Sequence, residues 1–357
     1  MSRLLSIIAF LGMFLLVYLG AQFYVFQRLS GLLQIRRGII FYVIAIAVAL
    51  WFPIASFVVR NSTGIFSRIF YAGAASWLGA VFFLLCLLAI HEVVRLFVKI
   101  DAKTAGIAIL ILGIVFTSVA LINALFIRVH TIELQIPKLE KATTIVQLSD
   151  IHVGTIHNSE YLKEIVDKTN ALNPDMVLIT GDLVDGSGPL SYEMLQPLEG
   201  LKAKTFFTTG NHEEYEGLDK VLPLVQRTGV QILRNELANY KGIQIVGIDN
   251  PGEGFRRNNS EISQIKINKS KAAILMFHPP SGLEDAQAAG ISLQLSGHTH
   301  NGQIIPFNLL SRLAFPRVQG LYEYKGTYLY TTYGTGTWGP PMRLGSSNEI
   351  VLLKLKK

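Results

Sequence analysis

Four long apolar stretches occupy the first third of the chain and predict four transmembrane helices. They cover about residues 4–26, 39–59, 70–92 and 105–127. Each is close to the roughly 20 residues that an apolar helix needs to cross a bilayer. Pro53 lies inside the second stretch, where neighbouring helices can satisfy the carbonyl group that it leaves unpaired. Residues 1–127 are therefore expected to form a four-helix transmembrane region.

From about Thr143 the pattern changes to short apolar runs that alternate with amphipathic segments. The runs predict buried strands at 144–148, 175–180, 205–209, 243–248, 273–277, 291–295 and 327–332. The amphipathic segments predict helices at 160–172, 192–201 and 218–228. Strands alternating with helices, followed by a strand-rich half, predict an α/β domain over 144–357. Residues 128–143 are expected to be a linker, and the polar residues 253–270 a mobile insertion.

Composition agrees with a membrane protein and narrows the function. The chain is 50% hydrophobic and 16% charged, whereas soluble domains carry about 25% charged residues. Residues 1–127 hold nine Lys and Arg against two Asp and Glu, so residues 128–357 hold 23 of each and are neutral. A nucleic-acid partner is not expected, because a basic binding surface is missing. The single cysteine, Cys86, excludes a disulfide scaffold.

The basic residues between the predicted helices suggest an orientation. Four spans place both termini on one side of the membrane. The first and third loops carry six Lys and Arg, and the N-terminal tail and middle loop carry three. The positive-inside rule then makes the richer loops cytoplasmic and the C-terminal domain extracytoplasmic. The side that holds the C-terminal domain also has six Lys and Arg when Arg128, Lys138 and Lys141 are counted. The opposite orientation therefore stays open.

Polar clusters follow five of the predicted strands. They are Asp150–His152, Gly181–Asp185, Gly210–Glu213, His278–Pro280 and Gly297–His300. In open α/β sheets, ligands bind outside the carboxyl ends of the strands. The clusters contain five of the eight histidines and supply oxygen and nitrogen donors without sulfur. This donor set suits Mn²⁺, Fe or Zn²⁺ rather than a thiolate zinc site.

The spacing within these clusters favours a pair of metals. Asp150 and His152 alternate along an extended chain, so both can reach one ion. Asp182 could bridge two ions through its two oxygens. Two metals about 3.5–4 Å apart clamp the attacking and leaving oxygens of a displacement at phosphorus. Glycines before Asp182, Asn211 and His298 are expected to allow a close backbone approach.

Taken together, the five clusters resemble the signature of the calcineurin-like metallophosphoesterase superfamily over about residues 145–350. Two segments look like those of the bacterial membrane-associated branch of this superfamily. They are Ser296–His300 with Gln303, and the run Gly334–Arg343. The membrane region makes the chain similar to transmembrane proteins with a metallophosphoesterase domain. The resemblance implies a four-layer α/β-β/α sandwich with a two-metal site at the edge of the sheets. It also implies a hydrolase acting on phosphoric ester or anhydride bonds.

The resemblance further implies a role for each polar cluster. One metal would be held by Asp150, His152, Asp182 and His300. The other would be held by Asp182, Asn211, His278 and His298. Mn²⁺ is the expected ion, with Fe or Zn²⁺ as alternatives. A hydroxide between the ions would attack phosphorus, while His212 contacts the phosphate and protonates the leaving oxygen.

Interpretations also follow for four side chains outside the proposed ligand sets. Asp185 and Glu213 fit roles in orienting ligands, with solvated turn carboxylates as the alternative. Arg343 could contact phosphate, because a guanidinium matches its geometry. Trp338 is interpreted as a packed loop residue rather than part of a membrane-facing rim.

The sequence therefore predicts a membrane-anchored phosphoesterase with two metal ions. It would hydrolyse phosphomonoester, phosphodiester or pyrophosphate bonds in a phosphorylated small molecule or a lipid-linked or envelope substrate, because the linker keeps the domain near the bilayer. Two alternatives are a non-catalytic membrane sensor or scaffold with a structural metal site, and a nuclease-type member of the superfamily. The neutral charge of 128–357 disfavours the nuclease.

Overall fold

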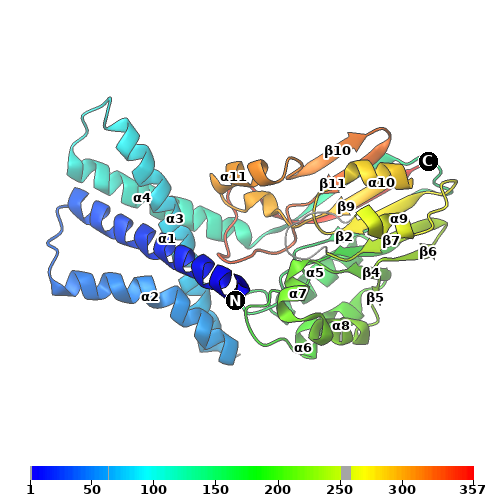
Figure 1. Cartoon of the computed structure of the whole chain (residues 1–357), viewed down its shortest axis with the longest axis horizontal. Helices are drawn as coiled ribbons and strands as arrows, with labels where there is room; N and C mark the ends of the chain where they lie inside the picture. The colour runs from blue at the N-terminus through cyan, green and yellow to red at the C-terminus, as the bar shows by residue number, and fades with distance from the viewer. Residues whose placement is uncertain (1, 63, 251–258) are drawn as a thin grey trace.

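The computed structural model of the chain describes residues 2–62, 64–250 and 259–357, and divides them into a helical N-terminal region and an α/β domain (Figure 1). The long N-terminal helices are α1 (Ser2–Leu32), α2 (Ile39–Asn61), α3 (Ile65–Val94) and α4 (Ala102–Ala124). Among the described residues, α2, α3 and α4 are long and apolar enough to cross a membrane. The region thus contains three candidate spans rather than clearly four, although α1 covers the first predicted stretch.

Helix α3 is the centre of the N-terminal region and packs against α1, α2 and α4. Loops 33–38 and 95–101 lie at the end away from the α/β domain (Figure 1). Near the other end of the region, Arg68 Nε donates a hydrogen bond to the Thr155 carbonyl oxygen of the domain, at 3.2 Å. The turn between α2 and α3 and the C-terminus of α4 therefore lie on the domain side.

The described part of the α/β domain contains two mixed six-stranded sheets. The first has the order β1 (Ile127–Gln135), β12 (Asn348–Lys356), β2 (Thr143–Leu148), β3 (Met176–Thr180), β4 (Lys204–Thr208) and β5 (Gln231–Ile232). The second has the order β10 (Gly320–Tyr324), β11 (Thr327–Thr331), β9 (Leu293–Ser296), β8 (Ala273–Phe277), β7 (Ile243–Ile248) and β6 (Glu236–Tyr240). Strands β2 to β5 are parallel to one another, as are β11, β9, β8 and β7.

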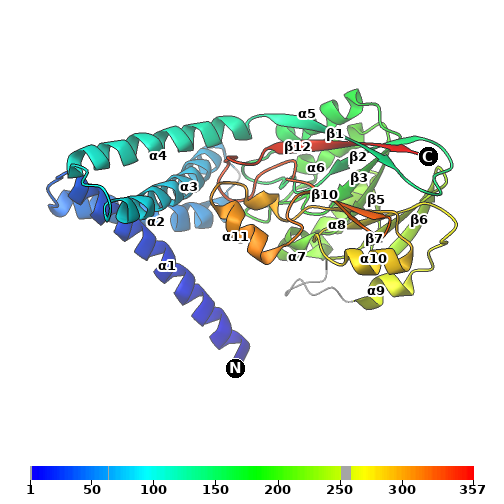
Figure 2. The ribbon, with the colours of Figure 1, turned by 90° about the horizontal axis from the view of Figure 1, so that it is seen from above.

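The two sheets pack face to face, with helices on their outer faces (Figure 2). Ile145 and Phe206 of the first sheet share one core with Ile274 and Leu295 of the second. The helices over the first sheet are α5 (Ser159–Ala171), α6 (Tyr192–Leu195) and α8 (Leu218–Arg227). Those over the second are α9 (Asn259–Gln264) and α10 (Leu283–Ala289). The result is a four-layer arrangement, helix–sheet–sheet–helix.

The remaining short helices lie at the ends of strands or in the loops beyond them. They are η1 (Gln196–Gly200), α7 (Asn211–Glu216), η2 (His300–Gly302) and α11 (Phe307–Ala314). All seven predicted strands are present, each with ends within two residues of the prediction. The predicted insertion at 253–270 lies partly outside the described residues, which resume at Asn259.

The expectation of a linker over 128–143 is wrong, because much of this segment is a strand. Residues of β1 pair in parallel with β12 along the full nine-residue length of β1. The apolar pattern did not reveal β1 because it is an edge strand, in which only Ile127 and Leu134 are buried. Two residues separate α4 from β1, and Asn348 Nδ2 donates a hydrogen bond to the Ala124 carbonyl oxygen at 2.7 Å. The last N-terminal helix is therefore joined directly to a sheet of the domain (Figure 2).

Candidate metal centre and active site

The seven predicted metal ligands lie at or just beyond the carboxyl ends of strands from both sheets. Asp150 follows β2, Asp182 follows β3 and Asn211 follows β4, while His278 follows β8 and His298 follows β9. Strands β3 and β8 contact each other across the interface between the sheets. Loops from the two sheets therefore converge at one edge of the domain, as ligand sites at strand ends require.

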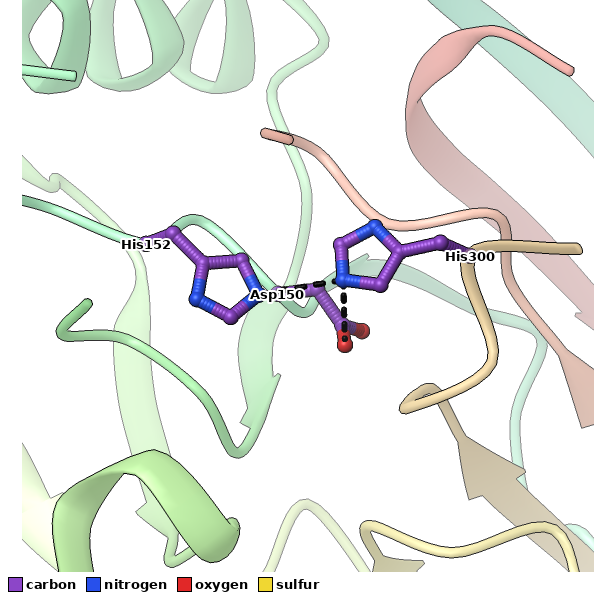
Figure 3. A group of neighbouring side chains, drawn as sticks. All are labelled: Asp150, His152 and His300. Carbon is purple, nitrogen blue, oxygen red and sulfur yellow. Dashed lines mark hydrogen bonds and ion pairs between the residues drawn. The ribbon is translucent and has the colours of Figure 1, made fainter. Parts of the chain in front are cut away.

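Asp150, His152 and His300 form the first group of potential ligands (Figure 3). Nε2 of His152 lies 3.0 Å from Nε2 of His300, which in turn lies 3.4 Å from Oδ1 of Asp150. All three residues are buried. Two imidazole nitrogens and a carboxylate oxygen that face one another in this way are suitable donors for a divalent cation.

Asp182, His278 and His298 form the second group. Nε2 of His278 lies 3.1 Å from Oδ2 of Asp182 and 3.3 Å from Nδ1 of His298. Nδ1 of His278 donates a hydrogen bond to the Thr180 carbonyl oxygen at 2.8 Å, which leaves Nε2 available to a metal. Oδ2 of Asp182 also lies 3.9 Å from Nε2 of His152, so this carboxylate stands between the two groups.

One buried polar atom in this region supports a fit to a metal ion. Oδ1 of Asn211 has no hydrogen-bond partner among the described residues. Leaving a buried polar atom unsatisfied costs about 1–3 kcal/mol, so native structures avoid it. A cation beside Asn211 Oδ1 would satisfy that oxygen. The carboxylate, imidazole and amide donors together therefore fit divalent ions of the Mn²⁺, Fe or Zn²⁺ type.

The backbone at the ligands is strained. Five of the seven have positive φ angles: Asp150 (51°), His152 (53°), Asp182 (51°), His298 (73°) and His300 (48°). Non-glycine residues in this region cost on the order of 1–3 kcal/mol each, and such residues cluster at functional sites. Asp150 and His152 thus approach His300 from a left-handed turn, not from the extended chain that the D-x-H spacing suggested.

Glycines allow the polar loops to pack closely, as the sequence predicted. A Cβ atom on Gly210 would lie 2.2 Å from Oδ1 of Asp182, and one on Gly297 would lie 2.1 Å from Oδ2 of Asp150. Both positions exclude any larger residue unless a candidate ligand moves. Gly181 contributes differently, since its φ of 86° is one that glycine adopts without strain.

The charges in the second group are strongly coupled. Burial opposes ionisation of Asp182, but the neighbouring His278 and His212 hold the pKa of this carboxyl well below its usual range. Burial likewise opposes the charge on His278, yet Asp182 and Asp150 raise the pKa of His278 to about 10. A metal that binds Nε2 of His278 must therefore displace a proton, which makes metal affinity dependent on pH.

His212 lies beside the ligands and lines the cavity that contains them. Its Nδ1 donates a hydrogen bond to the Asp185 carbonyl oxygen at 2.7 Å, which fixes the orientation of the ring. The other ring nitrogen, Nε2, lies 4.0 Å from Oδ2 of Asp182. A proton on Nε2 is therefore placed close to the candidate ligands.

Glu213 is buried and Asp185 is half-buried, so neither is a fully solvated turn carboxylate. Glu213 is fully buried and accepts hydrogen bonds from the backbone N–H groups of Gly210 (2.6 Å), Asp182 (2.9 Å), Leu183 (2.8 Å) and Val184 (3.1 Å). Burial, together with the charge of Asp182, raises the pKa of Glu213 to about 7. Oδ1 of Asp185 lies 3.8 Å from Nδ1 of His152.

Arg343 lies behind the candidate ligands and not on the cavity wall. Its side chain is fully buried, and Nη2 lies 3.1 Å from Nδ1 of His300. Nη1 donates a hydrogen bond to the His300 carbonyl oxygen, also at 3.1 Å. The backbone N–H of Arg343 bonds the carbonyl oxygen of Ala120 in α4. The guanidinium therefore does not lie on the cavity wall, where a phosphate contact was expected, and contacts His300 instead.

We expect Arg343→Lys to weaken metal binding. Lysine keeps the charge but cannot reproduce the forked contacts to His300, and loss of such a supporting contact typically costs about 10–100-fold in metal affinity. Titration of the metal-free protein with Mn²⁺ measures the affinity. Arg317→Lys is the matched control, because Arg317 pairs with Glu284 away from the site. A folded Arg343→Lys protein with unchanged affinity would contradict the positioning role.

The candidate ligands open into a cavity of about 480 Å³. Part of its wall comes from Leu78 and Phe82 of α3, and part from Phe307 of α11. Trp338 also lines it, is 57% exposed and lies with its ring 6.0 Å from that of His212, so its interpretation as a packed loop residue is wrong. Sequence motifs did not reveal these apolar residues, although the run FNLLSRLA of α11 has a clear amphipathic pattern.

The comparisons with known proteins agree with this site. Residues 143–302 match the family model described as calcineurin-like phosphoesterase. An uncharacterized metallophosphoesterase of Campylobacter jejuni is 30% identical over 361 residues, covering 96% of each chain. A transmembrane protein with metallophosphoesterase domain from Bos taurus is 29% identical, covering 92% of this chain and 82% of that protein.

This chain belongs to the calcineurin-like metallophosphoesterase family, and it is a phosphoesterase hydrolase. Among solved structures, a 5′-nucleotidase precursor from Thermus thermophilus matches with 14% identity and a TM-score of 0.36. That match covers 60% of this chain and 55% of the other, and it is too weak to indicate a substrate.

Proposed function

We propose that this chain is a membrane-anchored phosphoesterase that uses two divalent metal ions. The convergence of six donor side chains in two groups, with Asp182 between them, carries the proposal. Asp150, His152, Asp182 and His300 would hold one ion. Asp182, Asn211, His278 and His298 would hold the other. Mn²⁺ is the proposed ion, with Fe and Zn²⁺ as alternatives that donor chemistry alone does not separate.

The chain's own residues divide the remaining tasks. When bound, paired divalent ions stabilise the charge at phosphorus and generate a strong nucleophile at neutral pH. His212 contacts the phosphate and donates a proton from Nε2 to the leaving oxygen. The Asp185 carbonyl oxygen keeps the His212 ring in the orientation that this transfer needs. Glu213 holds the backbone around Asp182, and Arg343 holds His300.

The membrane region would contain four spans, with α1 added to the three candidate helices. Loops 33–38 and 95–101, on the side away from the domain, carry Arg36, Arg37, Arg95 and Lys99. The positive-inside rule favours a cytoplasmic location for these loops and an extracytoplasmic catalytic domain. Asp219→Cys in a Cys86→Ser background tests the orientation, because Asp219 is exposed on the domain. Labelling by an impermeant maleimide in intact cells is expected, and labelling only after lysis would reverse the orientation.

The activity is tested with purified full-length protein, stripped of metal and reloaded with Mn²⁺. Bis-p-nitrophenyl phosphate and p-nitrophenyl phosphate report diesterase and monoesterase activity, and single- and double-stranded DNA report nuclease activity. Metal-dependent release of p-nitrophenol without cleavage of DNA is the expected result. Two bound metals with no turnover of any substrate would instead favour the non-catalytic sensor or scaffold.

A further inference from the structure

The cavity above the candidate ligands is lined by two chemically different kinds of residue. Donor side chains such as Asp182 and His298 form part of its wall, whereas Leu78 and Phe82 of α3 form an apolar part. Helix α3 is one of the candidate membrane spans among the described residues. The site of phosphate chemistry therefore shares a wall with a helix that carries a membrane-spanning pattern.

Helix α11 contributes to the same apolar wall and also has an apolar outer surface. Phe307, Ser311 and Phe315 are spaced by four residues and line the cavity. None of the eight residues of α11 is buried, and Leu309 and Leu313 are 60% and 83% exposed. An exposed apolar helix face of this kind typically marks contact with a membrane or partner.

The position of α11 favours the membrane as its neighbour. The rings of Phe307 and Phe82 lie 6.2 Å apart, so α11 packs directly on α3. A small buried cluster joins Ile304, just before α11, to Phe83 of α3 and Ala120 of α4. The two views of the ribbon agree in placing α11 beside the domain end of the helical region (Figures 1 and 2). The exposed face of α11 thus continues the apolar outer surface of the membrane helices.

We propose that the cavity binds a phospholipid-type substrate, a phosphate ester that carries at least one long acyl or alkyl chain. The phosphate lies at the candidate metal ligands, and the chain lies along the apolar wall that α3 and α11 form together and reaches the cavity from the bilayer. This assignment rests on the proposed phosphoesterase function and names its substrate class. Burial of successive methylene groups against Phe82 and Phe307 is the physical source of the selectivity.

The test compares chain lengths on full-length, Mn²⁺-loaded protein in phosphatidylcholine nanodiscs. The first substrate pair is ethyl phosphate and decyl phosphate. The second pair is ethyl p-nitrophenyl phosphate and decyl p-nitrophenyl phosphate. We expect kcat/KM for the decyl member to exceed that for the ethyl member by about tenfold or more in the pair that is hydrolysed. Phe307→Gln, which makes the wall polar, and Ser311→Trp, which fills the cavity, should each lower this ratio at least threefold.

Leu321→Gln is the matched control, because Leu321 is an exposed apolar residue on β10 that does not line the cavity. It controls for the loss of an exposed apolar side chain outside the cavity, and its decyl-to-ethyl ratio should equal that of the unmodified chain. Hydrolysis of the ethyl substrates with a decyl-to-ethyl ratio near one, or with a ratio that neither cavity variant changes, would overturn the lipid assignment and leave the phosphoesterase function intact.

If no member of either substrate pair is hydrolysed, a binding measurement tests the lipid assignment separately from the phosphoesterase function. Decylphosphonate and ethylphosphonate are titrated into the same samples and followed by tryptophan fluorescence, since Trp338 lines the cavity. Binding that is at least about tenfold tighter for decylphosphonate and weakened by Phe307→Gln would support a lipid-binding cavity in a chain without phosphoesterase activity. Equal affinities, or tighter decyl binding that Phe307→Gln leaves unchanged, would overturn the lipid assignment.

Discussion

Asp182→Asn should lower Mn²⁺-dependent hydrolysis of p-nitrophenyl esters by on the order of 10²–10³-fold or more. Oδ2 of Asp182 lies 3.1 Å from His278 and 3.9 Å from His152, so both ligand groups lose their shared charge when the carboxylate becomes an amide. The side chain keeps its size, and the fold should survive. Metal content, measured alongside turnover, should fall as well.

Asp167→Asn is the control for this substitution. Asp167 is an exposed carboxylate on α5, and its pairing with Lys163 contributes little to stability. Its loss should leave turnover and metal content unchanged. If Asp182→Asn retained full activity with two bound ions, Asp182 would not be the shared ligand.

His212→Ala should lower kcat by about 10²–10⁴-fold while metal content stays the same. Nε2 of His212 faces the candidate ligands, but the ring is held through Nδ1 by the Asp185 carbonyl oxygen and belongs to neither proposed ligand set. The loss should be larger for alkyl phosphates than for p-nitrophenyl phosphate. An alkoxide needs a proton to leave, whereas p-nitrophenolate leaves without one.

His130→Ala serves as the control, because His130 is exposed on β1 and stacks on Tyr330 away from the cavity. His130→Ala should change neither the rate for alkyl phosphates nor the rate for p-nitrophenyl phosphate. An equal loss for alkyl and aryl substrates in His212→Ala would argue against proton donation by His212. A loss of metal from that variant would make His212 a ligand instead.

The sequence predicted the centre of the domain well because strong local signals lie there. Strands β7 and β8 begin and end at the predicted residues, since each is a short apolar run buried on both faces. Polar clusters follow β8 and four other strands, so the parallel topology of each sheet was enough to bring Asp150 and Asp182 to one edge of the first sheet and His278 to an edge of the second. The left-handed φ angles at Asp150 and His152 were not predictable, because spacing does not reveal them.

What the sequence missed depends on contacts between distant segments. Edge strand β1 carries exposed charged residues, and its partner β12 follows it by more than 200 residues. Arg343 looked like a phosphate ligand because an arginine between glycines and prolines suggests an exposed loop. Its burial follows from contacts with His300 and the end of α4, which only the fold brings together. The same holds for Phe82 and Trp338, whose cavity lies between separate parts of the chain.

The measurement that tests the central claim most directly is the metal stoichiometry of the full-length protein, determined as activity is restored. Metal-free protein is titrated with Mn²⁺, and bound metal is counted by mass spectrometry while hydrolysis of the p-nitrophenyl substrate is followed. The account predicts two ions per chain, activity that rises with occupancy of the second, and loss of both properties in Asp182→Asn. Full activity with one ion per chain, or with none, would contradict it.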